Sequence, residues 1–543
     1  MEKLRTKTPV DGIIPTYITP NAKIGIQKGE LAKPRTVYTN PTPTLLAKAV
    51  EPIKNKTVYL YGFGAQSSNH ARCLRSEGVH VKILGRNKGS SSMKAAIVDG
   101  FEVVELNELD PDDVDLMCFG LPDDQQVVAV QQVVNLLDPR KTTLGFFHGM
   151  TVHYGLQGFY GDDLKNALDW GWNMIIVAPK GPGNTVWENK QAGGGIACLF
   201  GAHEDSPDYE KTRLLAMAYA TAIGGYNGAM LETTFKEETE TDHYGEQGVL
   251  CGVMFYATYF MINILQRDFG YSLEEAQAKV EEEVIKVGHN LRRGGSDYLL
   301  KNASEKVKQN AKKWASLFYG QEVDFSDMSS ELETIGFDLR RLQPHLSPVD
   351  MVGQVISGDE LSPPKPLVEE WEGGIMGILI IASDMQYQIG REAGYSAEGM
   401  QFEVQQEIAL ITDCYLKGGL SYMIMRISTT AKHGMYVSGK YLFESQEISI
   451  RERFETVLGA IQNGTYAKQT KKDLVDIPRG SEEDWLWKAT MAVFESPEEQ
   501  LSKAARPATR PNFQGEDIQT VFLTPVGTWS YEFHNREGKI IAA

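Results

Sequence analysis

The segment GYSAEGMQFEVQQEIALITDCYLKGGLSYMIMRIS, residues 394–428, is a second copy of GYSLEEAQAKVEEEVIKVGHNLRRGGSDYLLKNAS, residues 270–304. The two segments align without a gap at an offset of 124 residues, and eleven of their 35 positions are identical. Chance would give only about two or three identities, so the pair marks a duplication. The surrounding sequence is rich in Glu, Lys, Ala and Met, which is typical of helices. The sequence therefore predicts an all-α region built from two fused copies of one unit.

A different pattern precedes the duplicated region. Between about residues 57 and 202, short runs of Val, Ile and Leu alternate with longer polar or amphipathic stretches, which indicates an α/β domain. Runs without polar alternation suit a parallel sheet that is buried on both faces. The predicted strands are TVYLYG, VHVKILG, FEVVEL, VDLMCFGL, TTLGFFHG, NMIIVAPK and GIACLFGA.

These patterns divide the chain into four parts. We expect an α/β domain with an N-terminal extension over residues 1–235, helical units over 236–356 and 357–470, and a C-terminal extension over 471–543. The linker between the helical units is expected around Ser357–Pro366, because GDELSPPKP would stop any helix.

Composition excludes several kinds of protein. The chain has 543 residues and a net charge of -18, which argues against nucleic acid or an anionic membrane as a partner. Its five cysteines are scattered without C-x-x-C spacing, so neither a disulfide framework nor a zinc site is indicated. We expect a cytoplasmic protein; a plastid protein whose transit peptide has been removed would look the same.

The first motif is YGFGAQS, Tyr61–Ser67, at the end of the first predicted strand. Gly62 and Gly64 would permit a tight turn and close approach of the backbone to a pyrophosphate, and Ala65 and Gln66 would begin a helix whose N-H groups face it. Ser67 occupies the third glycine position of G-x-G-x-x-G, so the motif alone fits an ordinary glycine turn equally well.

Cations and hydroxyl groups follow the second predicted strand. An NAD enzyme more often carries an acidic residue there, whereas a cation and hydroxyl groups suit the 2'-phosphate of NADP. The alternative is a solvated basic loop. The residues that favour NADPH are Arg86, Lys88, Ser90, Ser91 and Ser92.

Two later loops also leave the carboxyl ends of predicted strands, where ligands gather in sheets of this kind. FFHGMTVH offers His148, and VAPKGPGNT offers Lys180. A lone His or Lys at a strand end is more often structural. The flanking glycines favour a functional role, because they let backbone and side chain approach a ligand.

Two pairs of acidic residues lie in the helical region. Asp242 and Glu246 are four residues apart and precede an apolar helix, and Glu403 and Glu407 repeat this spacing among apolar neighbours in the second copy. Such pairs are common and usually solvated, but carboxylates beside a core need cations to compensate them. Four converging carboxylates would suit two Mg²⁺ ions.

Taken together and in order, these motifs resemble ketol-acid reductoisomerase, the acetohydroxyacid isomeroreductase of branched-chain amino-acid synthesis. The resemblance extends from about Lys56 to Gly434 and rests on GFGAQ, HG, APKGPG, ETD-x-x-GEQ-x-x-LCG and E-x-x-x-E followed by ISTTA-x-x-G. The duplication resembles the long class II form, which implies a Rossmann-like domain, a knotted helical core and a whole metal site within one chain.

The resemblance also implies roles for single residues. Asp242 would bridge two Mg²⁺ ions, Glu246 would complete the shell of one, and Glu403 and Glu407 would serve the other. Ser428 in ISTTA would hold the substrate. His148 and Lys180 would lie by the nicotinamide and metal-bound waters, and Glu407 is the candidate for proton exchange. Lys279 occupies the position of Glu403 in the first copy, so we expect one site per chain.

The implied reaction is Mg²⁺-dependent alkyl migration in 2-acetolactate or 2-aceto-2-hydroxybutyrate, followed by reduction with NADPH to the 2,3-dihydroxy acid. A homo-oligomer, dimer or tetramer, is expected. Three features depart from the family pattern: Ser67 replaces a glycine, Gln406 stands where His is common, and the tail beyond about Thr470 lacks a counterpart. The alternatives are a metal-independent NADP-dependent hydroxyacid dehydrogenase and a non-catalytic nucleotide-binding regulatory protein.

Overall fold

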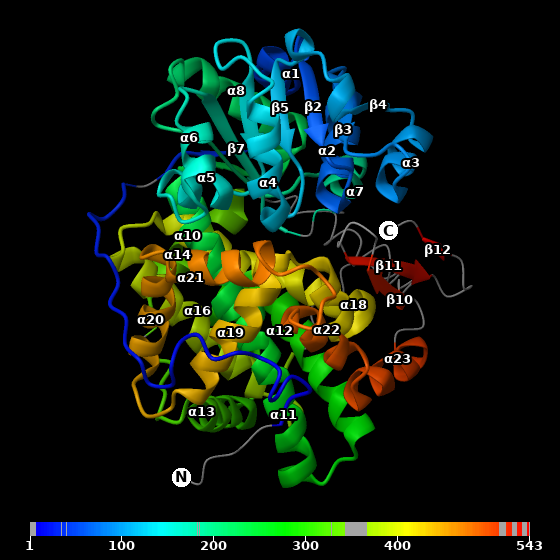
Figure 1. The fold of residues 1–543 in the computed structure, drawn as a ribbon. Coiled ribbons are helices and arrows are strands. Elements are labelled where there is room, and N and C mark those ends of the chain that lie inside the picture. The colour runs from blue at the N-terminus through cyan, green and yellow to red at the C-terminus, as the bar shows by residue number, and fades with distance from the viewer. Residues whose placement is uncertain are drawn as a thin grey trace. The chain divides into compact units, whose positions relative to one another are not determined.

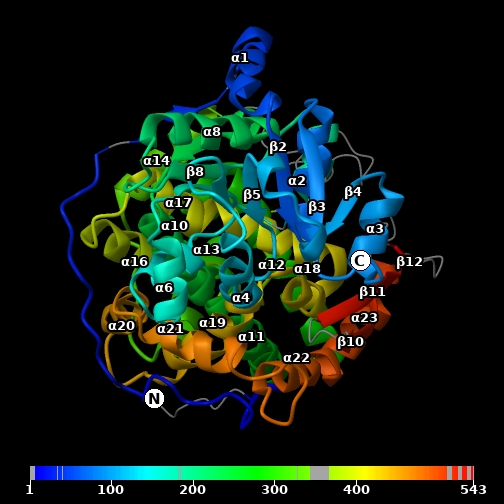
Figure 2. The ribbon, with the colours of Figure 1, turned by 45° about the horizontal axis from the view of Figure 1, so that its top comes forward.

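Two compact units make up the chain in a computed structural model (Figures 1 and 2). The structure describes residues 7–33, 35–39, 41–181, 183, 185–326, 328–342, 366–509, 517–523, 529–534 and 540–541. The sheet unit contains the described residues of 34–240 and 341–353, and the helical unit contains those of 1–33, 241–340 and 354–543. The boundary falls inside helix α10, Phe235–Gly245.

The sheet unit is built around nine strands. Its strand order is β1-β9-β8-β7-β6-β5-β2-β3-β4, and β2 to β7 form a parallel set in the doubly wound order of a dinucleotide-binding domain. The strands are β1 Val37–Tyr38, β2 Thr57–Tyr61, β3 His80–Gly85, β4 Glu102–Glu105, β5 Leu116–Phe119, β6 Thr143–Phe146, β7 Asn173–Pro179, β8 Cys198–Ala202 and β9 Met230–Glu232.

All seven predicted strands are present, but the sheet is mixed rather than wholly parallel. Strand β8 runs antiparallel to β7, pairing Ile175 with Ala202 and Pro179 with Cys198. Apolar composition reports burial on both faces and not strand direction, so the sequence could not reveal the reversal. Strands β1 and β9 were not predicted, because two or three residues are too short to show a period.

Helices cover both faces of this sheet. Alternate residues of β2 separate to opposite faces: Val58 and Leu60 join an apolar layer with α1, α2 and α8, whereas Tyr59 and Tyr61 do not. Helices α4, α5 and α6 pack on one another. The helices of this unit are α1 Pro43–Lys54, α2 Ala65–Ser76, α3 Ser91–Val98, α4 Asp123–Val134, α5 Met150–Leu156, α6 Asp162–Leu168, α7 Thr185–Gln191, α8 Tyr209–Ala222 and α9 Gly225–Gly228.

The described part of the helical unit consists mainly of helices and includes three π-helical turns. Among the residues that the structure describes, one helical stretch, Phe235–Phe269, is long and apolar enough to cross a membrane, but 94% of its apolar window is buried, as in a core helix. Its elements after α10 are η3 Glu246–Val253 (π), α11 Met254–Phe269, α12 Leu273–Asn302, α13 Glu305–Tyr319, α14 Ser330–Leu342, α16 Gly374–Glu392, α17 Ala397–Gln401, η4 Phe402–Gln406 (π), α18 Glu407–Arg426, α19 Thr429–Glu444, α20 Ile450–Gln462, α21 Thr465–Thr470, η5 Lys471–Val475 (π), α22 Trp485–Phe494 and α23 Pro497–Thr509, followed by β10 Asp517–Leu523, β11 Trp529–His534 and β12 Ile540–Ile541.

The duplication is repeated in the backbone at the same offset of 124 residues. Gly295 kinks α12 with φ 74° and ψ −168°, and Gly419 kinks α18 with φ 76° and ψ −165°. Ser304 and Ser428 each cap the next helix with a side-chain oxygen. Equivalent kinks and caps at equivalent positions show that the two copies share one fold.

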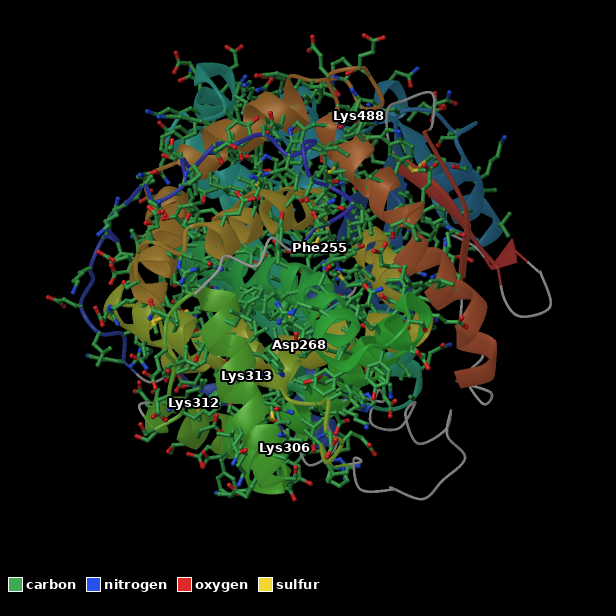
Figure 3. All side chains as sticks on the ribbon, turned by 90° about the horizontal axis from the view of Figure 1, so that it is seen from below. Phe255, Asp268, Lys306, Lys312, Lys313 and Lys488 are labelled. Atoms are coloured by element: carbon green, nitrogen blue, oxygen red, sulfur yellow. The ribbon has the colours of Figure 1, made fainter. Side chains whose placement is uncertain are left out.

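The two copies pack against each other. Helix α13 of the first copy lies on α16 of the second, and α19 of the second lies on η3 and α11 of the first. The inner face of α13 includes Trp314, whereas Lys306 and Lys313 are exposed on its outer face (Figure 3). Figure 3 also labels Phe255 of α11, which is fully buried.

The two ends of the chain correct the expected domain limits. Residues 7–33, expected to extend the α/β domain, belong instead to the helical unit: Val10, Ile14 and Ile18 join its apolar core, and the N-H of Ile24 donates to Oγ1 of Thr456 at 3.1 Å. Residues 471–494, expected to be part of an extension, also enter that core, through Leu474 and Leu486 among others. The predicted linker lies almost wholly outside the described residues.

Glu283 shows how the first copy uses the position that Glu407 occupies in the second. Its side chain is fully buried, and Oε1 accepts the N-H groups of Gly373 at 2.9 Å and Met376 at 3.3 Å, at the start of α16. Burial is the main cause that raises the pKa of this carboxyl to about 8, and Glu372 adds to it. Glu283 is therefore protonated in the folded protein at neutral pH.

We expect Glu283→Gln to stabilise the protein increasingly as pH rises from 5 to 8. The folded-state pKa lies above the ordinary unfolded value, so the folded protein holds more protons in this window and wild-type stability falls as pH rises. Glutamine removes this contribution, which amounts to at most about 1.4 kcal/mol per pH unit. Urea unfolding of both proteins at pH 5, 6, 7 and 8 measures the difference. Glu274→Gln, at an exposed position of the same helix, is the control, and parallel curves for Glu283→Gln would contradict the assignment.

Candidate functional site

The β2–α2 turn has the geometry that a dinucleotide requires. Gly62 has φ 96°, and a Cβ there would lie 2.8 Å from Leu121 Cδ2, so only glycine fits. Gly64 is the N-cap of α2, and a Cβ there would meet only open space. The turn lies at the switch point between β2 and β5, where ligands bind in sheets of this order. Backbone N-H groups at the start of α2, from Ala65 and Gln66 onward, can face a phosphate there.

Ser67, which stands where the motif usually has its third glycine, is accommodated by a neighbouring strand. Its hydroxyl is fully buried and donates to the carbonyl of Gly62 at 2.8 Å. A Cβ on Gly120, just after β5, would lie 2.4 Å from Ser67 Oγ, so the missing side chain at 120 makes room for the serine. The hydrogen bond from Ser67 to Gly62 therefore stabilises the turn.

The predicted NADP-binding residues in the loop after β3 fall into two groups. Lys88 pairs with Glu108 at 2.5 Å, and Ser90 is the N-cap of α3, where its hydroxyl accepts the N-H of Met93 at 3.4 Å. Both therefore have local structural partners. Arg86 is exposed beyond the end of β3, and Ser91 and Ser92 begin α3.

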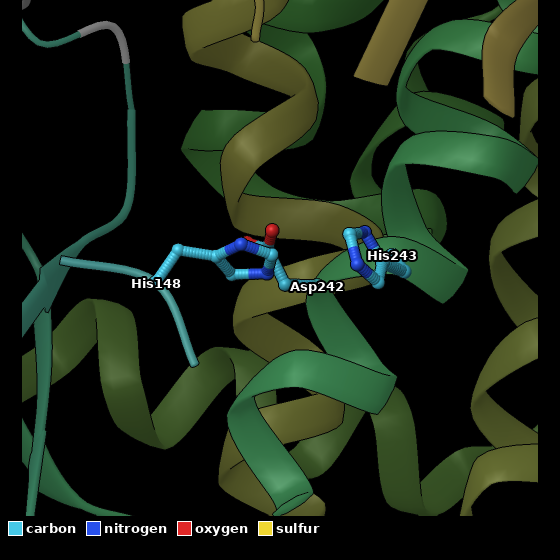
Figure 4. Close-up of side chains that lie close together, drawn as sticks. All are labelled: His148, Asp242 and His243. Carbon is cyan, nitrogen blue, oxygen red and sulfur yellow. The ribbon is translucent and has the colours of Figure 1, made fainter. Parts of the chain in front are cut away.

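His148 and Lys180 converge on one buried carboxylate, that of Glu238 in α10. His148 follows β6 and Lys180 follows β7, so neighbouring parallel strands place them at the same edge of the sheet. Lys180 Nζ lies 3.4 Å and His148 Nε2 4.0 Å from the carboxylate of Glu238, which also accepts the N-H of Gly149 at 2.8 Å. Nδ1 of His148 lies 3.2 Å from Asp123. Figure 4 shows His148 on its loop.

Glu238 was not predicted, although the sequence contains a signal for it. It precedes Asp242 by four residues, as Glu246 follows Asp242 by four, so the three are spaced for one helix face. Acidic residues at this spacing are too common to single one out. The strand ends that bring His148 and Lys180 to it distinguish Glu238 from its acidic neighbours.

In the helical unit, carboxylates from the two copies meet. One oxygen each of Asp242, Glu403 and Glu407 lie within 4.8 Å of one another. Asp242 is on α10, next to His243 (Figure 4); Glu403 is in η4 and Glu407 begins α18. Glu403 is fully buried and the other two are half-buried. A set of hard oxygen donors at this spacing fits Mg²⁺.

Glu246, the fourth predicted ligand, is not part of this group. It begins η3, and its carboxylate lies 3.7 Å from Nδ1 of the buried His243. In the first copy, Lys279 occupies the position of Glu403 and lies over the rings of Tyr271 and Trp371, at 4.7 and 4.8 Å from their centroids. A cation is thus present where a ligand would be needed for a second such group.

Ser428 caps α19, and a tyrosine connects its turn to the carboxylate helix. The Ser428 side chain accepts the N-H of Ala431 and contacts the Thr430 hydroxyl, both at 2.8 Å. The Tyr466 hydroxyl donates to the carbonyl of Thr430 at 2.8 Å, and its ring packs edge-on to His243 with centroids 5.0 Å apart. The turn of Ser428 is therefore held near the segment that carries Asp242.

Two family models match the two units. Residues 52–229 match the acetohydroxy acid isomeroreductase NADPH-binding domain, and residues 235–336 and 372–506 match the ketol-acid reductoisomerase C-terminal domain. The chain belongs to the ketol-acid reductoisomerase family. It is therefore an oxidoreductase with an isomerase step, in branched-chain amino-acid biosynthesis. Members of this family use a nicotinamide nucleotide and Mg²⁺.

Solved structures resemble the chain more weakly. An NADH-preferring ketol-acid reductoisomerase from an uncultured archaeon is 24% identical, with 56% of this chain and 87% of that chain covered and a TM-score of 0.43. Prephenate dehydrogenase from A. aeolicus is 14% identical, with 41% and 77% covered and a TM-score of 0.30. A putative NADP oxidoreductase from Bacteroides fragilis is 13% identical, with 54% and 99% covered and a TM-score of 0.33. The family assignment rests on the family models.

We expect Glu238→Ala to lower the free energy of unfolding by about 3–5 kcal/mol, because it leaves the ammonium of Lys180 buried without this carboxylate. The side chains of Lys180 and Glu238 are only 4% and 1% exposed. Urea unfolding followed by circular dichroism measures the loss. Glu210→Ala, whose side chain is 79% exposed beside Arg213, is the matched control and should change stability by less than about 0.5 kcal/mol. Equal effects of the two substitutions would show that the buried cluster contributes nothing particular.

Proposed function

We propose that the chain converts 2-acetolactate, or 2-aceto-2-hydroxybutyrate, to the 2,3-dihydroxy acid with two Mg²⁺ ions and NADPH. The observation that carries the proposal is the group formed by Asp242, Glu403 and Glu407. Three carboxylates so close together repel one another, and a divalent cation bound between them would compensate their negative charge. We expect the enzyme to act as a homo-oligomer, a dimer or a tetramer.

Each residue has its own role in this proposal. When bound, Mg²⁺ stabilises negative charge that develops on two substrate oxygens during alkyl migration, and NADPH supplies the hydride. Asp242 would serve both ions, Glu403 and Glu407 would hold one of them, and Glu246, which lies outside this group of three, would help to hold the other. Glu407 also exchanges the proton of the substrate hydroxyl. Ser428 holds the substrate, and His148 and Lys180 orient the nicotinamide, with Glu238 fixing their positions.

The alternatives fit the carboxylate group less well. A metal-independent hydroxyacid dehydrogenase would have no use for three carboxylates gathered from two repeat units. A non-catalytic regulatory protein would retain the same carboxylates at an energetic cost without a function.

Support for NADPH comes from the loop after β3. Arg86 is exposed at the carboxyl end of the sheet, beyond the strand that follows the dinucleotide turn, and Ser91 and Ser92 begin the next helix. A guanidinium and two hydroxyl groups suit the 2'-phosphate, which is the only part of NADPH absent from NADH.

We expect oxidation of NADPH by the purified chain to require both 2-acetolactate and Mg²⁺. Absorbance of the reduced nicotinamide follows the reaction, and removing the metal with a chelator should abolish it, because migration develops charge on two oxygens at once. Turnover that persists without a divalent cation would favour the metal-independent dehydrogenase.

The matching variant is Glu407→Gln. It should nearly abolish turnover of 2-acetolactate but leave measurable reduction of 3-hydroxy-3-methyl-2-oxobutanoate, since reduction needs only one polarised carbonyl. Glu305→Gln, at an exposed position of α13, should leave both activities unchanged. Equal loss of both activities in folded Glu407→Gln would refute this division of labour.

We expect the wild-type enzyme to prefer NADPH by roughly tenfold or more in kcat/KM, because hydrogen bonds between charged partners contribute about 1.5–3 kcal/mol. Replacing Arg86, Ser91 and Ser92 with Asp should narrow the preference, because carboxylates repel the 2'-phosphate. Ser90 is left unchanged because it caps α3. Lys48→Asp, an exposed charge reversal on α1, is the control. Equal use of NADPH and NADH by the wild-type enzyme would contradict the assignment.

A further inference from the structure

Helix α16 inserts a polar side chain into the π-helix that follows Asp242. Gln386 is fully buried; its Oε1 accepts the N-H of Val249 at 2.7 Å and its Nε2 donates to the carbonyl of Tyr244 at 2.5 Å. Gly248 has non-helical angles, φ −95° and ψ −113°, and a Cβ there would lie 2.1 Å from Gln386 Nε2. The glutamine therefore replaces a backbone hydrogen bond where the turn carrying Asp242 and Glu246 leaves regular geometry.

The same helix also holds the second π-helix. Ser383 is fully buried, and its hydroxyl donates to the carbonyl of Val404 at 2.8 Å, between Glu403 and Glu407. Ser383 and Gln386 are three residues apart and so share one face of α16. Gly245 brings the two ligand segments into direct contact, because a Cβ there would lie 2.8 Å from the carbonyl of Glu403.

The first copy provides an internal comparison. At the offset of 124, the positions of Ser383 and Gln386 are occupied in α11 by Tyr259 and by the apolar Ile262. The residues equivalent to η4, 278–282, are ordinary α-helix within α12. Between the duplicated segments, the π-helical turn and the polar bridge thus occur together in the copy that supplies Glu403 and Glu407, and both are missing from the copy with Lys279.

We propose that Gln386 and Ser383 are positioning residues that set the affinity of the carboxylate group for divalent cations. By fixing Tyr244 and Val249 on one side and Val404 on the other, they hold the two π-helical segments at the separation at which Asp242, Glu403 and Glu407 share one ion site. The inference rests on the proposed magnesium site. Side chains that orient metal ligands commonly change metal affinity by about 10–100-fold when replaced.

The test is Mg²⁺ binding to the full chain without nucleotide or substrate, measured by isothermal titration calorimetry. Gln386→Met keeps the length of the side chain and removes both hydrogen bonds; we expect the Kd for Mg²⁺ to rise by about tenfold or more. Ser383→Ala removes a single hydroxyl, is expected to fold, and should raise the Kd by about threefold or more. If Gln386→Met does not fold, Ser383→Ala decides the question alone.

Matched controls separate positioning from general destabilisation. Gln277→Met replaces a buried glutamine of α12, and Ser502→Ala replaces a buried serine whose hydroxyl donates to Glu281 at 2.8 Å; both should leave the Kd within about twofold of wild type. A Kd unchanged in folded Ser383→Ala and Gln386→Met, or raised equally in the controls, overturns the positioning role. Absence of Mg²⁺ binding by the wild-type chain would instead refute the proposed metal site itself.

Discussion

Three carboxylates held within 4.8 Å of one another are the constraint around which the helical unit is organised. Such groups repel one another, so the surrounding structure has to hold them in place. Holding the three carboxylates together requires contacts between the two repeats, because Asp242 comes from one repeat and Glu403 and Glu407 from the other. The close packing of η3 against η4, and the polar face of α16 between them, meet this requirement.

The duplication explains how one scaffold supports both a site and its structural counterpart. Glu407 and Glu283 are equivalent residues, yet Glu407 joins the carboxylate group while Glu283 accepts backbone N-H groups at the start of α16. Burial keeps Glu283 protonated, which lets it serve as a neutral cap. Equivalent glutamates thus have different surroundings in the two copies: one caps a helix and the other joins the carboxylate group. Glu283 of the first copy therefore caps α16, and α16 is the helix whose Gln386 and Ser383 contact the segments that carry the carboxylates.

The sheet unit follows a similar logic at its carboxyl edge. The turn has a positive φ at Gly62 and open space beside Gly64, and Ser67 fits because Gly120 on the neighbouring segment has no side chain. Next to it, parallel strands β6 and β7 bring His148 and Lys180 onto the carboxylate of Glu238. The strand ends therefore position His148 and Lys180, and the buried carboxylate of Glu238 in α10 lies next to both side chains.

Features that depend on local order could be predicted from the amino-acid sequence. Apolar runs identified the seven main strands, the aligned copies identified the repeat, and four-residue spacing identified the acidic pairs, since periodicity and identity are properties of neighbouring residues. Features that depend on contacts between distant segments became visible in the folded chain. Strand β8 runs antiparallel to β7, and residues 7–33 pack on the helical core. Glu246 lies outside the carboxylate group, whereas Glu238 contacts Gly149 and Gln386 contacts Tyr244. Nothing in the composition around Gln386 distinguishes it, because its role exists only where Gly248, far away in the chain, leaves room for its side chain.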